Sequence, residues 1–377
     1  MLMKTPLTEN DAVVLDAKPV DPRSFDDRVK DFDGVVQEVT IAFAQSRWPR
    51  VSFEPWIYLR DGKPAAAVLV MVQAIPLKLG KIAVVKWGPI LADETAAGGR
   101  AIIAAATRHL TQEYATRRGM MMSIMGRAET APRVFAFEDM TARGFRRGNQ
   151  LPFPDRYLVK VRLSDEEQRK SFAQKWRYHL NKSEKEGLAF EVAPGSDFHR
   201  FAKLYDSMTR RKHFPDYSAY QTLQNTMKSH TEELRPQLFF VTKDGEDVAG
   251  AVIFTSGRTA VYLYGATNDV ALPLRAGYLM HARIISWLRD NTRADWYDLG
   301  GNDGFSGLHQ FKKGMVGSAG MITPIPPIAH YAATPYARFT GGLAHFARDS
   351  LSAVKSFTRR LRGADAKPDM RPGERDT

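Results

Sequence analysis

Cysteine is absent from the 377-residue chain. Without it the protein cannot form a disulfide scaffold, a thiolate zinc site or a cysteine nucleophile, and the absence fits a reducing compartment. The N-terminal segment MLMKTPLTENDAVVLDAKPVDPRSF lacks the apolar core of a signal peptide, and the longest apolar runs, such as AAAVLVMVQAIPL, are too short to cross a bilayer. We therefore expect a cytoplasmic protein with no membrane-spanning segment.

Catalytic constellations built on histidine are missing as well. The nine histidines are scattered and none lies in a G-x-S-x-G context, so we predict no Ser-His-Asp triad. Only His309 lies inside a candidate site, where we expect it to face solvent. Histidines and carboxylates do not cluster at the spacing of metal ligands, so we predict no metal.

Positive charge is in excess, because 54 Lys plus Arg residues stand against 42 Asp plus Glu residues and give a formal net charge of +12. Such an excess favours partners that carry phosphate, such as RNA, nucleotides or anionic lipid, although ordinary solubility gives the same pattern. The length is about two to three times that of a usual single domain. With 44% hydrophobic residues, we expect two domains with substantial cores.

The chain contains a repeated pattern of predicted elements. Residues 237–267 read as three consecutive strands joined by tight turns, followed by a helix near 274–291, a short strand DWYDL and a glycine-rich loop. The same order occurs earlier, with a helix near 95–117 and the strand MMMSIM. The turn Asp61-Gly62 corresponds to the turn Asp244-Gly245, and Trp87-Gly88 of the third predicted strand corresponds to Tyr264-Gly265. This repeat predicts an α/β fold of two tandem mixed-sheet domains that face a shared cleft.

A helix between the two copies is predicted over residues 164–187. Ser164 and Glu167 form a capping-box pattern, and Gly187 is a candidate C-cap. One face of this helix is apolar and carries Phe172, Trp176 and Leu180. Its other faces carry cations, of which Lys175, Arg177 and Lys182 are candidates for contact with RNA phosphates, although a solvated linker helix has the same composition.

Six segments, taken in order, resemble the FemABX peptidyltransferases: AFAQSRWPR, KWGPIL, RYHLNKSEKEGLAFEV, LYDSMTRRKHF, VYLYGATN and YDLGGNDGFSGLHQFKKGMVG. The resemblance covers residues 37–325. It implies two GNAT-like acyltransferase domains that move an aminoacyl group from aminoacyl-tRNA to an amine of a peptidoglycan-type precursor of the cell envelope, linked to a lipid or nucleotide diphosphate. Residues 213–236 leave no room for the coiled-coil arm of some members, and the tail from residue 335 has no counterpart in the family.

The predicted domain boundaries follow from the repeat and the resemblance. Residues 1–36 are an N-terminal extension, 37–160 the first GNAT-like domain on the acceptor side, and 161–325 the second GNAT-like domain on the acyl-donor side. Residues 335–362 are predicted to form a basic amphipathic helix, followed by a disordered tail over 363–377.

The last resembling segment, residues 297–317, holds the predicted catalytic residues. Acyl transfer from an ester to an amine passes through an oxyanion, which needs positive charge or N–H donors. Lys312 resembles the lysine of the family's FK motif and is predicted to supply that charge, and Asp298 is a candidate acceptor for the proton of the attacking amine. A solvated helix face for Lys312 and a loop cap for Asp298 are the alternatives. Phe311 is predicted either to stack on the adenosine or to pack in the core.

The first half is predicted to bind the acceptor. Arg47 and Arg50 flank Trp48, a combination suited to a diphosphate and an adjacent ring. By resemblance, Arg211 and Tyr217 close the acceptor groove, while Tyr264 is expected to face the cleft. A structural role is the alternative for each of these side chains.

The tail combines apolar residues at helical spacing with six cations and one acid. This pattern is typical of a helix on anionic lipid, so we expect residues 335–362 to contact the inner membrane surface, making the protein peripheral to the cell membrane. Packing of the helix against the domain is the alternative.

Two other functions are compatible with the sequence. One is an acyl-CoA-dependent N-acyltransferase of the same fold that acts on a sphingoid-like lipid amine or a polysaccharide amine. Against it, the segment ALPLRAGYLMH offers only Gly277 where a loop for the CoA pyrophosphate usually has two glycines. The other is a non-catalytic protein that binds RNA or membrane. No cofactor is predicted beyond the acyl donor itself.

Overall fold

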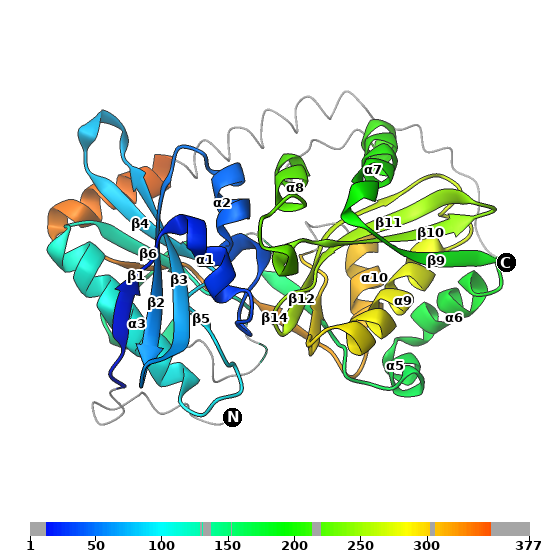
Figure 1. Cartoon of the computed structure of the whole chain (residues 1–377), viewed down its shortest axis with the longest axis horizontal. Helices are drawn as coiled ribbons and strands as arrows, with labels where there is room; N and C mark the ends of the chain where they lie inside the picture. The colour runs from blue at the N-terminus through cyan, green and yellow to red at the C-terminus, as the bar shows by residue number, and fades with distance from the viewer. Residues whose placement is uncertain are drawn as a thin grey trace.

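The computed structural model describes residues 13–128, 130, 137–151, 153–212, 220–301 and 306–347. The chain forms two mixed sheets that lie side by side (Figure 1). The first has the order β1 (Asp16–Pro19), β2 (Ser52–Arg60), β3 (Lys63–Ala74), β4 (Lys81–Lys86), β6 (Met121–Met125), β15 (Ala329–Tyr331) and β7 (Arg146–Arg147), with β5 (Ile90–Leu91) paired to β3. The second has the order β9 (Leu188–Ala193), β10 (Gln237–Lys243), β11 (Glu246–Phe254), β12 (Thr259–Thr267), β13 (Trp296–Asp298), β8 (Asp155–Lys160) and β14 (Met321–Pro324).

Helices cover the sheets. Those of the first half are α1 (Pro22–Val29), α2 (Ile41–Arg47), α3 (Gly99–Leu110), which continues in wider turns to Arg117, and α4 (Phe137–Ala142). Those that follow are α5 (Asp165–Ser171), α6 (Gln174–Ser183), α7 (Phe198–Lys212), α8 (Tyr220–Thr226), α9 (Ala276–Asn291) and α10 (Ser306–Val316). A further helix over residues 335–347, called the C-terminal helix below, ends the described chain.

The two sheets repeat one another strand for strand. From β1 to β4 and from β9 to β12 neighbouring strands are antiparallel, and then β4 pairs with β6, and β12 with β13, in parallel. A parallel pair needs a crossover, which α3 and α9 supply. The matching hairpin turns share their backbone geometry too, because Asp61, Gly62, Asp244 and Gly245 all have positive φ. The predicted duplication of a mixed α/β domain is confirmed.

Alternating side chains bury both faces of the second sheet. Phe239 and Val241 of β10 belong to the core that α9 covers, whereas Leu238 and Phe240 belong to the core beneath α7. Successive residues of a strand point to opposite faces, so one strand feeds two cores. A third core joins the halves, because Phe25 and Val29 of α1 share it with Phe254 and Val261 of the second sheet.

Each sheet is completed by a strand from beyond the predicted domain boundary. Strand β8 lies before residue 161 but pairs with β13 and β14 of the second sheet, whereas β15 lies after residue 325 but pairs with β6 and β7 of the first. The boundaries at 160 and 325 therefore do not coincide with the sheets. The physical reason is that β6 and β13 each present an open edge, which an apolar strand from either half can fill.

The predicted N-terminal extension, in its described part, belongs to the first half. Strand β1 pairs with β2, and Phe25, Val29 and Val35 are fully buried. The Asp26 carboxylate accepts hydrogen bonds from the backbone N–H groups of residues 41 and 42, at the start of α2. A segment that supplies core residues and holds the start of a helix is part of the domain.

The predicted linking helix is broken in two. The capping box of Ser164 and Glu167 is present at the start of α5, and Phe172, Trp176 and Leu180 are buried. However, Phe172 and the following residue have extended ψ values of 147° and 148°, which end α5 and start α6. Gly187 has φ +64° but lies beyond the end of α6, in the turn before β9.

The C-terminal helix packs on the first sheet, beside strands that are distant in sequence (Figure 1). Its buried side chains include Ala337, Thr340 and His345. Ser123 of β6 shares hydrogen bonds with the His345 Nε2 atom and with the His330 Nδ1 atom of β15, both at 2.9 Å. The predicted helix over 335–362 is thus present up to residue 347; its remainder and the predicted tail 363–377 lie outside the described residues.

Among the described residues, no helix combines the length and the apolar character needed to span a bilayer.

Two adjacent glycines test the packing of the C-terminal helix. Alanine is favoured over glycine inside a helix by about 1 kcal/mol. A Cβ atom on Gly341 would lie 2.5 Å from Met121 Cβ, whereas one on Gly342 would meet nothing within 4 Å. We expect Gly342→Ala to raise the free energy of unfolding by up to ~1 kcal/mol and Gly341→Ala to lower it by about 1–3 kcal/mol, as measured by urea unfolding. A gain in both variants would mean that the helix does not pack on Met121.

Candidate functional site

A pocket lies where the two sheets meet. Its walls come from the ends of β4 and β6 in the first sheet and from β8, β12 and β13 in the second. The polar side chains in its lining are Glu38, Arg127, Thr130, Arg156, Thr259 and Asp298. Ligands of α/β proteins commonly bind beyond the carboxyl ends of parallel strands, which is where β4 and β6 lead into this pocket.

Asp298 lies in the pocket wall but is held by an arginine. The Arg156 guanidinium donates to both Asp298 carboxylate oxygens, through Nε at 3.0 Å and Nη2 at 2.8 Å, and the Gly300 backbone N–H donates to Oδ1 at 2.9 Å. These hydrogen bonds engage both carboxylate oxygens and fix the carboxylate between β8 and the glycine-rich loop. This arrangement counts against the predicted role of Asp298 as the proton acceptor.

Lys312 lies on α10, close behind the glycine-rich loop, and is only 6% exposed. Its ammonium donates to the carbonyl oxygens of Leu299 at 2.6 Å and Gly301 at 2.5 Å. The lysine therefore fixes the backbone of the loop as well as placing a positive charge beside it. It differs from the solvated helix-face lysine that the sequence left as the alternative.

Aromatic side chains of α6, α9 and α10 pack against one another in a core of the second sheet. Phe311 packs against Trp176, Tyr278 and His281, with ring centroids 4.9–6.1 Å apart. The structure thus gives Phe311 its core role. His309 is half-buried, and its Nδ1 atom lies 2.5 Å from the Tyr157 hydroxyl, so the expectation that it faces solvent is wrong.

His281 was not identified from the sequence. It lies on α9, is 4% exposed, and its Nδ1 atom is 3.1 Å from the Tyr297 hydroxyl. Burial lowers the pKa of His281 to about 3, and the positive charge of Lys312 lowers it further. His281 is therefore neutral at physiological pH.

Lys86 is a second residue that the sequence did not single out. Its ammonium lies 5.4 Å from the ring centroid of Trp48 and 5.5 Å from that of Trp87, which places it between two indoles (cation–π). Some solvent contact remains, yet burial lowers the pKa of Lys86, while the nearby Glu38 carboxylate acts in the opposite direction. The sequence feature that could have identified Lys86 is a lysine at the end of the otherwise apolar strand IAVVK.

The predicted acceptor residues divide into two groups. Trp48 is half-buried, with its ring edge on Phe43, and it lies beside Lys86, whereas Arg47 and Arg50 are exposed at the end of α2. Tyr264 instead lies in a cluster with the rings of Tyr205 and Tyr220, away from the pocket lining.

Arg211 and Tyr217 were also predicted to bind the acceptor. Arg211 lies in the last turn of α7, and neither its side chain nor Tyr217 belongs to the described part of the structure.

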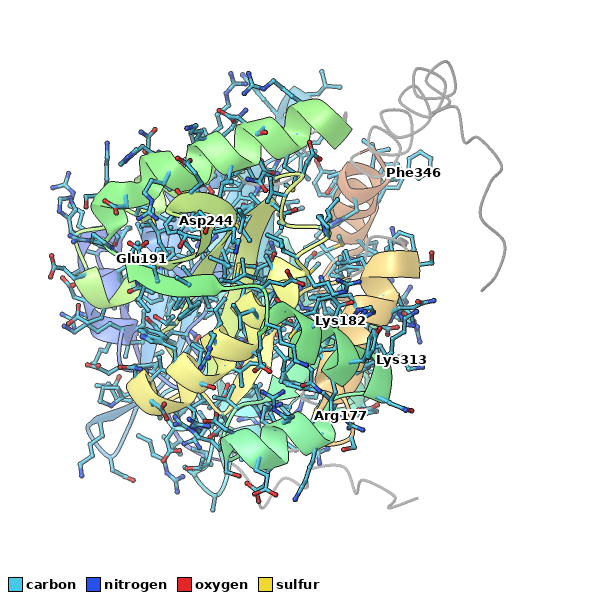
Figure 2. All side chains as sticks on the ribbon, turned by 90° about the vertical axis from the view of Figure 1, so that its right-hand side faces the viewer. Arg177, Lys182, Glu191, Asp244, Lys313 and Phe346 are labelled. Carbon is cyan, nitrogen blue, oxygen red and sulfur yellow. The ribbon has the colours of Figure 1, made fainter. Side chains whose placement is uncertain are left out.

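The predicted RNA-binding residues lie on α6. Figure 2 shows Arg177 and Lys182 of this helix on the same side of the molecule as Lys313, which belongs to the neighbouring α10. Lys175 and Lys182 are exposed, and the Lys182 ammonium lies over the Tyr178 ring. Arg177 donates to the carbonyl oxygens of residues 170 and 172 and so also stabilises the α5–α6 junction.

Helix α6 packs beside the N-terminal end of α9. The Ser183 hydroxyl donates to the carbonyl oxygen of Arg275, the residue before α9, and the Arg275 Nε atom donates to His179 at 3.0 Å. Phosphates commonly bind at such helix ends through free backbone N–H groups. Here the approach to that end is lined by side chains of α6.

Within the described ranges, His, Asp and Glu side chains form no cluster that would hold a metal ion.

The low pKa of His281 makes a testable pH dependence. Because the folded-state pKa lies below the unfolded value of about 6.5, the unfolded chain binds the extra proton between these values. Stability from this group is therefore complete above pH 6.5 and falls as the pH drops, by about 1.4 kcal/mol per unit. We expect His281→Gln to reduce this acid sensitivity in unfolding experiments between pH 6.5 and 4.5. Parallel curves for the two proteins would contradict a buried neutral histidine.

Comparison with known proteins adds a family model and several solved structures. The model of an acetyltransferase (GNAT) domain matches residues 170–313. No curated protein sequence matches the chain at a significant level.

The fold is similar to that of FemX, with a TM-score of 0.69 and 15% identity over 84% of this chain and 97% of FemX. It is also similar to the C-terminal domain of a putative lysylphosphatidylglycerol synthetase from Agrobacterium fabrum, with a TM-score of 0.53 and 13% identity over 84% and 92% of the two chains. L-PGS from Bacillus licheniformis gives a TM-score of 0.51 and 14% identity over 86% and 96%. At these identities the likeness is one of fold. The chain therefore has the fold of tandem GNAT-like proteins, and residues 170–313 of its second half match the model of an acetyltransferase (GNAT) domain.

Proposed function

We propose that the chain transfers an aminoacyl group from aminoacyl-tRNA to an amine of a peptidoglycan-type precursor linked to a lipid or nucleotide diphosphate. The observation that carries this proposal is the position of α6. It packs beside the N-terminal end of α9, where a CoA pyrophosphate would bind backbone N–H groups, and it presents exposed cations beside α10. This arrangement favours a nucleic-acid donor over acyl-CoA, which is the alternative donor.

The pocket between the sheets supports an anionic acceptor. Lys86 lies near it between Trp48 and Trp87, whereas Arg127 and Arg156 of its lining are paired with Glu94 and Asp298. Cations next to indole rings suit a diphosphate joined to a ring or an apolar group. Arg47 and Arg50, exposed at the end of α2, extend the positive charge outward from Trp48.

Glu38 is a better candidate than Asp298 for the proton acceptor. It is half-buried in the pocket lining, and among the described residues no ion pair with its carboxylate is found. The amine attacks the ester carbonyl carbon, a C–N bond forms, and the surplus proton of the ammonium passes to Glu38. The ester C–O bond then breaks, and the ribose oxygen leaves and takes up a proton.

Lys312 contributes in two ways to this reaction. Its charge lies beside the glycine-rich loop, where it would stabilise a nearby oxyanion. Its bonds to Leu299 and Gly301 also keep the loop backbone in one conformation, which lowers the cost of reaching the transition state. An ester of tRNA is already activated, so positioning and charge stabilisation are the main requirements.

Two neighbouring lysines provide a matched test. Lys312 is buried and bonded to the loop, whereas Lys313 is exposed. We expect Lys312→Met to lower the turnover of aminoacyl transfer by roughly 100- to 1000-fold, and Lys313→Met to leave turnover at saturating donor unchanged. The measurement is transfer of a labelled amino acid from aminoacyl-tRNA to a lipid- or nucleotide-linked acceptor. Equal turnover in the two variants would remove Lys312 from the mechanism.

The donor is tested through the exposed cations of α6. If tRNA crosses this helix, Lys175→Gln with Lys182→Gln should raise the KM for aminoacyl-tRNA and lower the salt dependence of log KM by roughly 0.7–0.9 per lost phosphate contact. The turnover at saturating donor should stay the same. Transfer from acyl-CoA, or a KM that ignores both substitutions and salt, would favour the CoA-dependent alternative.

A further inference from the structure

The C-terminal helix presents an unusual outer face. Tyr336, Phe339, Leu343 and Phe346 are 60%, 71%, 44% and 70% exposed, and their spacing places all four on one side. The opposite side, with Ala337, Thr340 and Gly341, packs on the first sheet. Phe346 lies on the outer side of the helix (Figure 2). The helix thus buries small residues and exposes large apolar ones.

A second exposed apolar side chain lies next to this helix. Leu77, at the tip of the β3–β4 hairpin, is 89% exposed, and both Leu77 and Lys78 have left-handed backbone with φ near +60°. Such a conformation is unfavourable for a residue with a side chain. In the described fold, Leu77 makes no apolar contacts that would offset this cost. Burial of its side chain against another apolar surface would offset it.

The hairpin and the C-terminal helix form one unit. The Tyr336 hydroxyl donates to the Leu79 carbonyl oxygen at 3.2 Å. Beneath them a small core joins Ile75 and Ile82 of the hairpin to Met121, with Ala344 of the helix packed against it. The exposed side chains on the two elements therefore keep a fixed relative position and present a single surface.

The charges around this surface are positive. Lys78 and Lys81 flank Leu77 on the hairpin, and Arg338 is exposed on the helix. Aromatic side chains with basic neighbours are typical of an element that lies in the interface of an anionic bilayer.

We propose that this surface, formed by the C-terminal helix and the β3–β4 hairpin tip, docks on an anionic lipid bilayer. A second copy of the chain is a poorer occupant, because pairing the surface with itself brings like charges together. If the proposed function holds, docking on a bilayer implies that the physiological acceptor is linked to a lipid and not to a nucleotide. This choice of acceptor rests on the proposed function. The docking itself requires neither donor nor catalysis.

The test is flotation of the full chain with vesicles of phosphatidylcholine alone or with phosphatidylglycerol added, at low and high salt. We expect binding only to the anionic vesicles, weakened by salt. Phe339→Ser with Phe346→Ser should weaken binding by at least about tenfold, and Leu77→Ser several-fold, because each substitution removes apolar burial. Leu272→Ser changes an equally apolar side chain that is 61% exposed on the second half and is the matched control.

The outcomes separate docking from catalysis. The substituted side chains are exposed, so the melting temperature of each variant should match that of the parent chain, and aminoacyl transfer to a soluble acceptor should be unchanged. Absence of flotation, or equal flotation of all variants, would overturn the docking surface whatever the enzyme assays show. A dimer in solution that the Phe339 and Phe346 substitutions abolish would overturn it in favour of a second copy. Flotation of the parent chain without detectable aminoacyl transfer would instead count against the proposed function.

Discussion

The exchange of strands between the two sheets is the constraint on which the rest of the structure depends. Strand β8 completes the second sheet although it lies within the predicted first domain, and β15 returns from beyond the predicted second domain to complete the first. Neither sheet can therefore form fully without chain from the far side of the predicted boundary. The seam, meaning the boundary where the two halves meet, is reinforced by Arg293, whose guanidinium donates to the carbonyl oxygens of Asp31 and Phe32. It is also reinforced by the core that Phe25 shares with Phe254.

This constraint locates and shapes the candidate site. The pocket lies on the seam, so its polar lining is drawn from both halves, and the Arg156–Asp298 pair joins the exchanged strand β8 to its neighbour β13. A buried ion pair of this kind adds little net stability, but it fixes the position of both groups. The residues left to meet a substrate are then Glu38 and Lys86 from the first half and the loop held by Lys312 from the second. A rigid seam favours catalysis by positioning, which suits an activated ester donor.

The two copies of the fold have diverged around their crossover helices. At the start of α3, a Cβ atom on Gly99 would lie 2.8 Å from Leu91, so this helix end packs closely on the first sheet. At the start of α9, the contact comes from α6, whose Ser183 hydroxyl donates to the Arg275 carbonyl oxygen. The two crossover helices therefore begin against different neighbours, a strand in the first half and a helix in the second.

The sequence predicted what local patterns determine. Strand alternation, the paired Asp-Gly turns and the capping box at Ser164 depend on near neighbours, and the duplicated fold follows from them. The break after Phe172 has no glycine or proline to mark it, and the partner strand of β8 depends on which sheet edge is open. For the site, the sequence singled out Lys312 and Asp298, which lie on either side of the glycine-rich loop, but their roles depend on their partners. Arg156, 142 residues from Asp298, and Lys86, between two indoles, come together only through tertiary packing.

The C-terminal helix shows why periodicity alone could not separate membrane contact from packing. Its apolar residues recur at helical spacing, but the face that packs on the sheet is made of small residues, because Gly341 lies against Met121 and His345 is bonded to Ser123. The large residues that a periodicity argument assigns to a core point outward instead. Packing on the domain and contact with a bilayer are therefore compatible, since they use opposite faces of one helix. A helix anchored in this way meets a membrane as a preformed surface and loses less conformational entropy on binding than a free tail would.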